Sequence, residues 1–95
     1  MFIKSDGNYS TVYLKKGDEL RKKMIRNTLK SLENELINME KIVRCHKSYI
    51  VNLNKVKQVT GNARGYNFIL EGLEMTIPVS RNFPKSYFKE INIQA

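Results

Sequence analysis

The chain is poor in the side chains that form disulfides, metal sites and catalytic pairs. Its 95 residues include one cysteine, Cys45, and one histidine, His46. A single cysteine cannot form an intramolecular disulfide, which excludes the small secreted domains that depend on such bonds and favours a cytoplasmic location. Structural zinc sites need four cysteine or histidine ligands, so we expect no metal and no cofactor.

These two residues are also poor candidates for catalysis. Cys45 and His46 are adjacent in sequence, and neighbours on an extended strand point to opposite faces. A catalytic cysteine and its base normally come from distant parts of a chain, and the sequence has no P-loop and no GxGxxG run. We therefore expect no catalytic residues and no enzymatic activity, with Cys45 a passive small residue.

Long apolar segments are also missing. No run approaches the ~18 residues that span a bilayer, and the N-terminal segment MFIKSDGNYS lacks the apolar stretch of a signal peptide. We expect a soluble protein without a membrane partner. The composition, 41% hydrophobic and 27% charged, is that of a globular chain. A chain of this length has room for one hydrophobic core, which predicts a single domain over residues 1–95.

Acidic residues are few relative to basic ones. Seventeen lysines and arginines against nine aspartates and glutamates give a net charge of +8. Such a surface attracts polyanions, which include nucleic acid, an anionic membrane face and an acidic protein. Charge alone does not choose among them, and it can also serve only to keep a protein in solution.

Hydrophobic patterning predicts a protein made mostly of β-strands. Residues 8–16 favour a strand and end at Gly17-Asp18, which predicts a hairpin whose return strand, 19–25, has one face in solvent. Residues 41–57 contain two buried segments around a polar stretch, and a strand resumes at 56–60. A loop is expected over residues 61–65. The strands 66–70 and 75–79 then flank the turn Glu71-Gly72 and form a second hairpin. Pro78 lacks an amide proton, so its strand should lie at a sheet edge or end there.

Two short helices complete the expected fold. In residues 27–40 apolar side chains from Leu29 to Met39 recur at spacings of three and four, and Asn27 or Thr28 can cap the helix. In residues 81–93 aromatic and apolar side chains have similar spacing. Pro84 is acceptable there in a first helical turn.

Basic and small polar residues gather in three segments at predicted strand ends or in loops. These segments are Lys4 to Asn8, Arg44 to Ser48, and Ser80 to Lys85. Lysine, arginine, serine and asparagine are the residue types that contact phosphates and base edges. Each segment alone can be an ordinary solvated turn. Three of them in a chain with an excess of basic residues favour nucleic acid as the partner.

Four segments together resemble one family of DNA-binding domains. Residues 44–52, RCHKSYIVN, resemble the central RxHxSxxVN signature of LytTR domains. Residues 5–9 (SDGNY), 28–33 (TLKSLE) and 77–81 (IPVSR) resemble the early GNY loop, a helix and the C-terminal SR motif of the same family, in the same order. The match covers nearly the whole chain. The sequence is therefore similar to the output domains of bacterial response regulators.

The resemblance implies a fold and a way of binding duplex DNA. LytTR domains are elongated stacks of small, mainly antiparallel sheets with short helices, and their loops enter successive major grooves, commonly at direct repeats in promoters. Transferred by motif, the base-reading residues are Asn8, Lys47 and Arg81. Phosphate contacts and positioning would come from a larger set, namely Lys4, Ser5, Tyr9, Arg44, His46, Ser48, Ser80, Asn82 and Lys85.

The three base-reading candidates have suitable chemistry. Asparagine can pair with adenine through two hydrogen bonds, and arginine or lysine can donate to guanine, each good pair being worth roughly 1–3 kcal/mol of discrimination. For His46 the alternative is a structural hydrogen bond that orients its own segment. Residues 49–52 are assigned to core and turn.

The start of the chain departs from the family pattern. LytTR domains usually carry one or two strands before the GNY loop, and we expect these N-terminal strands to be missing. Either the chain is trimmed from a longer regulator, with Met1 an introduced start, or another chain completes the first sheet. We expect the C-terminal part of a regulator, preceded by a receiver or sensor domain. A dimer on direct repeats is one arrangement that the resemblance implies.

Two other functions are open at this stage. A small basic RNA-binding β domain would share the charge and the strands, but sequence-specific RNA binding usually needs aromatic side chains placed to stack on bases. Most aromatics here lie in apolar or alternating patterns that indicate packing. A protein-interaction module that docks through an exposed first strand is the third interpretation.

Overall fold

The protein folds into two antiparallel β-sheets and short helices. The computed structural model describes residues 2–39, 41–62, 64–70, 72 and 75–91. Its elements are β1 (Phe2–Asp6), β2 (Tyr9–Lys16), β3 (Glu19–Ile25), α1 (Leu29–Glu35), β4 (Ile42–His46), β5 (Tyr49–Asn52), the 3-10 helix η1 (Leu53–Lys55), β6 (Val56–Asn62), β7 (Gly65–Leu70), β8 (Thr76–Val79) and the 3-10 helix η2 (Lys85–Glu90). The mostly-β class with small antiparallel sheets is confirmed.

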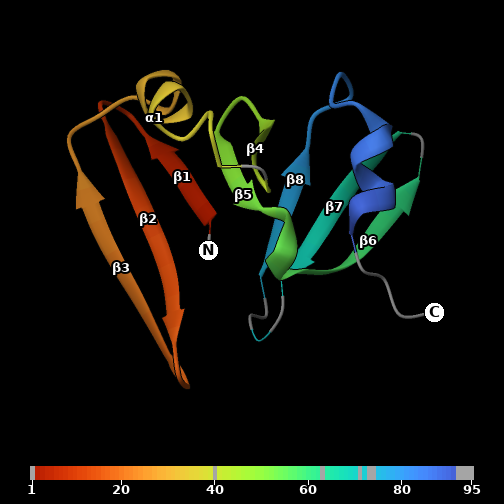
Figure 1. Ribbon diagram of the computed structural model, residues 1–95, viewed down its shortest axis with the longest axis horizontal. Helices are drawn as coiled ribbons and strands as arrows, with labels where there is room; N and C mark the ends of the chain where they lie inside the picture. Colours follow the sequence, from red (N-terminus) through yellow and green to blue (C-terminus); the bar gives the residue numbers. More distant parts are fainter. Residues whose placement is uncertain (1, 40, 63, 71, 73–74, 92–95) are drawn as a thin grey trace.

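The two sheets follow one another along the longest axis of the molecule. The first has the strand order β3-β2-β1-β5-β4 and the second the order β6-β7-β8. Figure 1 shows the larger sheet on the left and the smaller sheet on the right. β4 and β5, which belong to the larger sheet, lie in the middle of the view, next to the smaller sheet. The molecule measures 37 × 32 × 25 Å.

Two clusters of apolar side chains hold these layers together. On one face of the larger sheet, Leu29 and Leu32 of α1 pack on Ile3 and Ile50. On the other face, a larger cluster joins the two sheets and η2. It contains Phe2, Cys45, Val51, Leu53, Val56, Phe68, Leu70, Ile77, Val79, Phe83 and Ile91. Adjacent strand residues point to opposite faces, so Phe2 and Ile3 place β1 in both clusters.

The sequence predicts no strand before residue 8, and this is wrong. β1 lies in the middle of the larger sheet, between β2 and β5. A strand buried on both faces lacks the apolar and polar alternation of a half-buried one. Lys4 and Ser5 therefore lie in a strand, not in a loop.

The position of β1 also contradicts docking through an exposed first strand, because both of its edges are already paired. For the same reason β1 itself leaves no edge for another chain to complete. β1 is one strand ahead of the Gly7 turn. The expectation that LytTR domains carry a further strand before it stays a prediction.

The first helix is shorter than predicted. Thr28 caps it, since its hydroxyl oxygen accepts a hydrogen bond from the amide of Ser31 at 3.1 Å. The helix ends at Glu35, and Met39 is 53% exposed instead of extending its apolar side. The amide of Met39 donates to the carbonyl of Leu36, and this turn delivers the chain into β4. The spacing of Met39 from the earlier apolar residues favours a longer helix, but the pairing of β4 with β5 requires the chain to leave the helix before Met39.

The β3 strand and the β6–β7 turn also differ from expectation. β3 is exposed along its length apart from a half-buried Ile25, because it is an edge strand whose outer half extends beyond both clusters. The expected loop 61–65 is mostly strand. Gly61 and Asn62 end β6 and Gly65 begins β7. Gly61 has φ 101°, and a side chain there would collide with the carbonyl oxygen of Gly65.

The C-terminal half otherwise follows the predictions. The strands over 66–70 and 75–79 form β7 and β8, and Pro78 lies in β8 at an edge of the smaller sheet. A short helix closes the described chain as η2, with Pro84 as its N-cap. Glu71 of the expected turn and Ile93 of the expected helix lie outside the described residues.

Candidate nucleic-acid interface

Four connections between elements lie along one edge of the molecule, which we call the loop edge. They are the β1–β2 turn at Gly7-Asn8, the β4–β5 turn at Lys47-Ser48, Arg64 between β6 and β7, and the loop of residues 80–84 between β8 and η2. The β1–β2 turn, the β4–β5 turn and the loop after β8 are on the upper side in Figure 1, and Arg64 lines a hollow with Lys47 and Arg81. The fold thus brings together three segments that are far apart in sequence and were each predicted to bind nucleic acid.

Backbone hydrogen bonds connect three of these segments. The amide of Ser5, near the end of β1, donates to the carbonyl of Ser48 at 2.8 Å. The amide of Ser80 donates to the carbonyl of Cys45 at 2.7 Å. The β4–β5 hairpin is therefore bonded to the other two on either side, and the three predicted segments form one connected scaffold.

The β4–β5 turn holds its backbone while its basic side chain remains exposed. The guanidinium of Arg44 donates to the carbonyl of Lys47 at 2.8 Å and lies 3.4 Å from a carboxylate oxygen of Glu33. The Lys47 side chain is exposed. Arg44 thus orders the turn that presents Lys47, and a contact of Arg44 with phosphate stays a prediction.

His46 supports the same turn. Its Nδ1 accepts a hydrogen bond from the amide of Ser48 at 3.1 Å, and its ring meets Tyr49 edge-on at 5.8 Å between centroids. Burial and, to a smaller extent, the charge of Lys47 lower the pKa of His46 below its ordinary value. An imidazole that accepts at Nδ1 carries its proton on Nε2 when neutral. The structural hydrogen bond considered for His46 is present, and Nε2–H remains as a donor.

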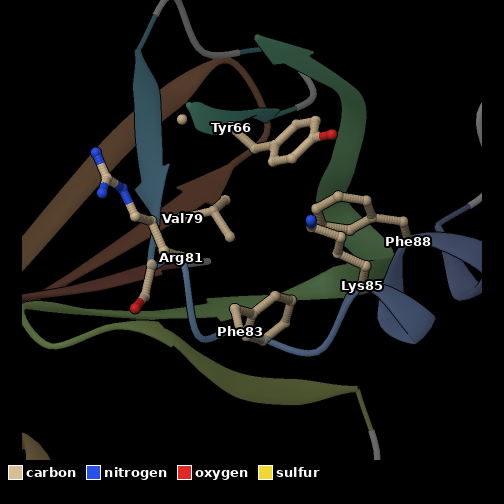
Figure 2. Close-up of a pocket in the computed structure, with 8 residues that line it drawn as sticks. Tyr66, Val79, Arg81, Phe83, Lys85 and Phe88 are labelled. Carbon is tan, nitrogen blue, oxygen red and sulfur yellow. The ribbon is translucent and has the colours of Figure 1, made fainter. Parts of the chain in front are cut away.

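The loop after β8 anchors Arg81 from both sides. The hydroxyl oxygen of Ser80 accepts from the amide of Asn82 at 3.3 Å, and the amide of Phe83 donates to the carbonyl of Ser80 at 3.1 Å. Phe83 is buried, whereas Arg81 and Asn82 are exposed. Figure 2 shows the Arg81 guanidinium pointing away from the rings of Phe83 and Phe88. A fixed backbone therefore carries a free, charged side chain.

A hollow in the loop edge joins the Lys47 turn to the Arg81 loop. It is lined by His46, Lys47, Arg64, Gly65, Tyr66, Asn67, Pro78, Val79, Ser80, Arg81 and Asn82. Arg64 brings a third exposed cation to this hollow. Arg64 is not among the residues predicted from the sequence, because residues 61–65 have the composition of a plain loop. The signal was a basic residue between two glycines, where a tight turn leaves the side chain in solvent.

Comparison with known proteins assigns the chain to a family. The sequence profile of the LytTr DNA-binding domain matches residues 1–92. The chain belongs to the LytTR family. It is 34% identical over 89 residues to the sensory transduction protein LytT of Oceanobacillus iheyensis, an alignment that covers 92% of this chain and 35% of the relative. The chain thus spans about a third of the length of that curated relative.

A solved structure has the same fold. The LytTr DNA-binding domain of a Bacillus cereus protein described as a methyl-accepting/DNA response regulator superposes with a TM-score of 0.70 at 22% identity. The superposition covers 96% of this chain and 78% of that one. The arrangement of two antiparallel sheets and short helices is thus that of a LytTR domain.

The remaining candidates in this LytTR domain lie near the β1–β2 turn. Asn8 is exposed in the turn itself, and Tyr9, which begins β2, is 42% exposed. Lys4 is exposed in β1, and Ser5 is half-buried. None of these four lines the hollow between Lys47 and Arg81.

Lys85 lines a second hollow, together with Tyr66, Ser80 and Arg81. Its Nζ is 5.6 Å from the centre of the Tyr66 ring, where the ammonium interacts with the aromatic face. Figure 2 shows Lys85 beside Phe88, on the other side of the Phe83 ring from Arg81. Lys85 is thus close to the Arg81 loop, although it is not among the residues that line the hollow with Lys47 and Arg64.

LytTR is a family of DNA-binding domains. Cys45 is fully buried, and this burial raises the pKa of its thiol to about 12, so it remains protonated. Among the described residues no three histidine, cysteine, aspartate or glutamate side chains are close enough to hold a metal ion. No described helix is long and apolar enough to cross a membrane.

Proposed function

We propose that this LytTR domain is the output module of a bacterial transcription regulator and reads duplex DNA with its loop edge. The observation that carries the proposal is the bonding of the three predicted segments into one scaffold through Ser5–Ser48 and Cys45–Ser80. Base readout requires side chains on a rigid support, because a loosely held contact loses discrimination. Asn8, Lys47 and Arg81 meet this requirement.

The size of the loop edge suits successive grooves of one duplex. The loop edge runs along the longest dimension of the domain, which is 37 Å (Figure 1). Equivalent major-groove positions on one side of B-DNA are about 34 Å apart. The full length of the domain is thus comparable with one turn of the duplex, and we propose that the β1–β2 turn and the Arg81 loop enter neighbouring grooves without a recognition helix.

Each base-reading candidate has a distinct chemistry. The amide of Asn8 can pair with the N6 and N7 edge of adenine, and the guanidinium of Arg81 can donate two parallel bonds to O6 and N7 of guanine. The Lys47 ammonium donates to guanine as a point charge. Phosphate contacts then fall to residues beside them, among which Ser48, Ser80 and Asn82 are closest in sequence. Arg64 joins this group because it lines the hollow with Lys47 and Arg81.

The placement of the aromatic side chains favours duplex DNA over RNA. Among the tyrosines and phenylalanines in the described part of the chain, only Tyr9 is exposed. Tyr13, Tyr49, Tyr66, Tyr87 and Phe88 are partly buried and pack against the larger apolar cluster. Reading unpaired bases needs free ring faces. These rings are already used in packing, so a single-stranded ligand finds few surfaces on which to stack.

The rest of the proposal concerns the whole protein. The chain spans 35% of LytT, so we propose that a receiver or sensor domain precedes it in a longer regulator. We further propose that two copies bind paired direct repeats in promoters, one domain per repeat. A domain with this task works in the cytoplasm, where bacterial DNA is found.

The test begins with selection of bound sites from a random duplex pool, followed by affinity measurements against salt. If the loop edge neutralises several phosphates, the logarithm of affinity should fall linearly with the logarithm of salt concentration, with a slope near −0.9 per contact. Asn82→Ala and Arg64→Ala would be compared with Lys55→Ala. Lys55 is an exposed cation of η1, at the opposite end of β5 from the Lys47 turn.

The expected results separate the proposal from its alternative. Loss of Arg64 should make the salt slope shallower by about one unit, whereas loss of Lys55 should leave it unchanged. A flat salt response, or equal effects of Arg64→Ala and Lys55→Ala, would overturn binding through the loop edge. Stronger binding to single-stranded or duplex RNA than to any selected DNA would favour the RNA-binding function instead.

A further inference from the structure

A second basic surface lies on the β2–β3 hairpin, away from the loop edge. The hairpin turn at Gly17-Asp18 points to the lower side in Figure 1, opposite the turn that carries Asn8. Among the described residues, pairing of β2 with β1 ends at Tyr13 and Phe2, so residues 14–21 form a two-stranded ribbon. Its basic residues and those of the following stretch are Lys15, Lys16, Arg21, Lys22 and Lys23, against the acidic Asp18 and Glu19.

The outer strand of this hairpin, β3, is an unpaired edge. Among the described residues its one neighbouring strand is β2. An edge strand presents free amide and carbonyl groups that can pair with another extended chain. Leu20 and Met24 on this strand are 44% and 59% exposed, so apolar side chains also face solvent there. β3 thus combines free backbone groups, exposed apolar side chains and positive charge.

The geometry of the turn identifies which backbone groups point outward. Gly17 has φ 64° and Asp18 does not have a positive φ, as in a two-residue turn with glycine first. Such a turn is flanked by a hydrogen-bonded pair, here Lys16 and Glu19. Hydrogen-bonded and non-hydrogen-bonded pairs alternate along an antiparallel ladder. The outward amides of β3 therefore belong to Leu20, Lys22 and Met24.

We propose that β3 is a docking edge for an extended acidic segment of a partner protein, which adds a strand beside it. Main-chain hydrogen bonds supply affinity in this mode, and alternate side chains supply specificity. Leu20, Lys22 and Met24 share one face of the sheet and suit a partner strand with acidic and apolar residues on that face. On the other face Lys23 meets a further acidic side chain, whereas Arg21 is already paired with Glu19 at 3.3 Å.

Charge selects this occupant over the other extended chain at hand, a second copy of the protein. Pairing two β3 strands would place Arg21, Lys22 and Lys23 of each copy beside the same residues of the other, and like charges across strands are destabilising. The position of the hairpin argues against DNA as the main ligand, since a duplex on the loop edge lies at the opposite end. That step rests on the proposed DNA-binding function, whereas the addition of a strand beside β3 does not.

The experiment uses the full 95-residue chain, labelled with nitrogen-15, and a synthetic peptide of alternating glutamate and valine as long as β3. A peptide of alternating lysine and valine is the charge control. We expect the acidic peptide to shift the amide signals of Leu20, Lys22 and Met24 most and to slow their hydrogen exchange by about tenfold or more. The basic peptide should leave them unchanged.

A matched pair of variants isolates the backbone contribution. Lys22→Thr removes the charge but keeps the outward amide, whereas Lys22→Pro removes both at a position that makes no ladder bond to β2. We expect Lys22→Pro to bind the acidic peptide about tenfold more weakly than Lys22→Thr. If the proline variant is not folded, a second pair serves: Lys23→Glu should weaken binding and Lys55→Glu should not.

Three outcomes would overturn the proposal. If the acidic peptide shifts no amide signals of β3, the lysines do not bind a partner. They would then only protect the edge strand against aggregation. Equal affinity of folded Lys22→Thr and Lys22→Pro, or of Lys23→Glu and Lys55→Glu, would rule out strand addition guided by charge. A random-sequence duplex that shifts the same amides and displaces the peptide would make the hairpin a nucleic-acid surface.

Discussion

The guanidinium of Arg44 donates a hydrogen bond of 2.8 Å to the carbonyl of Lys47, three residues further along the chain. This bond crosses the β4–β5 turn and fixes the backbone from which the Lys47 side chain projects. The same guanidinium lies 3.4 Å from a Glu33 carboxylate oxygen in α1. Arg44, which the sequence suggested for phosphate contact, thus connects α1 to the Lys47 turn. We assign this turn to base reading.

Replacing Arg44 should therefore reduce specificity as well as affinity. We expect Arg44→Ala to lose about 1–3 kcal/mol on the selected duplex, the worth of one good base contact, because Lys47 is no longer held in place. Loss on a scrambled duplex should be smaller. Glu33→Gln, which weakens the ion pair but keeps the bond to Lys47, is the control. Equal losses of Arg44→Ala on both duplexes would make Arg44 a plain phosphate contact.

Arg81 should discriminate between bases without supporting the fold. Its side chain is exposed on an anchored loop, so Arg81→Ala should remain folded by circular dichroism. We expect a loss of roughly 1–3 kcal/mol on the selected duplex and much less on a scrambled one. Arg81→Lys should recover part of this loss, since an ammonium keeps the charge without the planar fork. Both variants need measuring at one fixed salt concentration, and unfolding of Arg81→Ala would show a structural role.

The imidazole of His46 should make stability depend on pH. Burial and Lys47 lower its pKa in the folded protein, so below about pH 6.5 the unfolded chain binds more protons than the folded one. The contribution of His46 to the free energy of unfolding is present above that pH and decreases as the pH falls through the folded-state pKa. Protonated Nδ1 can no longer accept from Ser48.

Denaturant unfolding at several pH values between 5 and 8 tests this expectation. His46→Asn keeps an acceptor in place of Nδ1 but does not titrate in this range, so it serves as the reference. The difference in free energy of unfolding between the native protein and His46→Asn should shift against the native protein as the pH drops. A difference that stays constant with pH would contradict the lowered pKa of His46.

Cys45 should be inert in the folded protein. It is fully buried with a thiol pKa raised from 9.0 to about 12, which lowers its thiolate fraction at neutral pH about a thousandfold. A thiol-specific reagent should label the native chain slowly and the denatured chain quickly. The label reports on one site, because the chain has no other cysteine. Rapid labelling under native conditions would show that the β4–β8 contact opens readily.

Local sequence patterns were sufficient for much of the secondary structure. The sequence predicted the Gly17-Asp18 turn, a helix cap at Asn27 or Thr28, and an edge strand or strand end at Pro78. Each of these depends on the backbone chemistry of one or two residues. The family motifs likewise located Asn8, Lys47 and Arg81 at turns. These are short-range properties, and a sequence displays them directly.

The tertiary structure alone decided the position of β1 and the composition of the loop edge. Phe2 pairs with Tyr13 on one side and with Val51 on the other, and the second partner is too distant for any local period to reveal. Arg64, Arg81 and Lys47 line one hollow only because the loops of the two sheets lie at the same edge. Pairing between distant strands depends on which apolar faces pack together, and that choice is made by the whole chain at once.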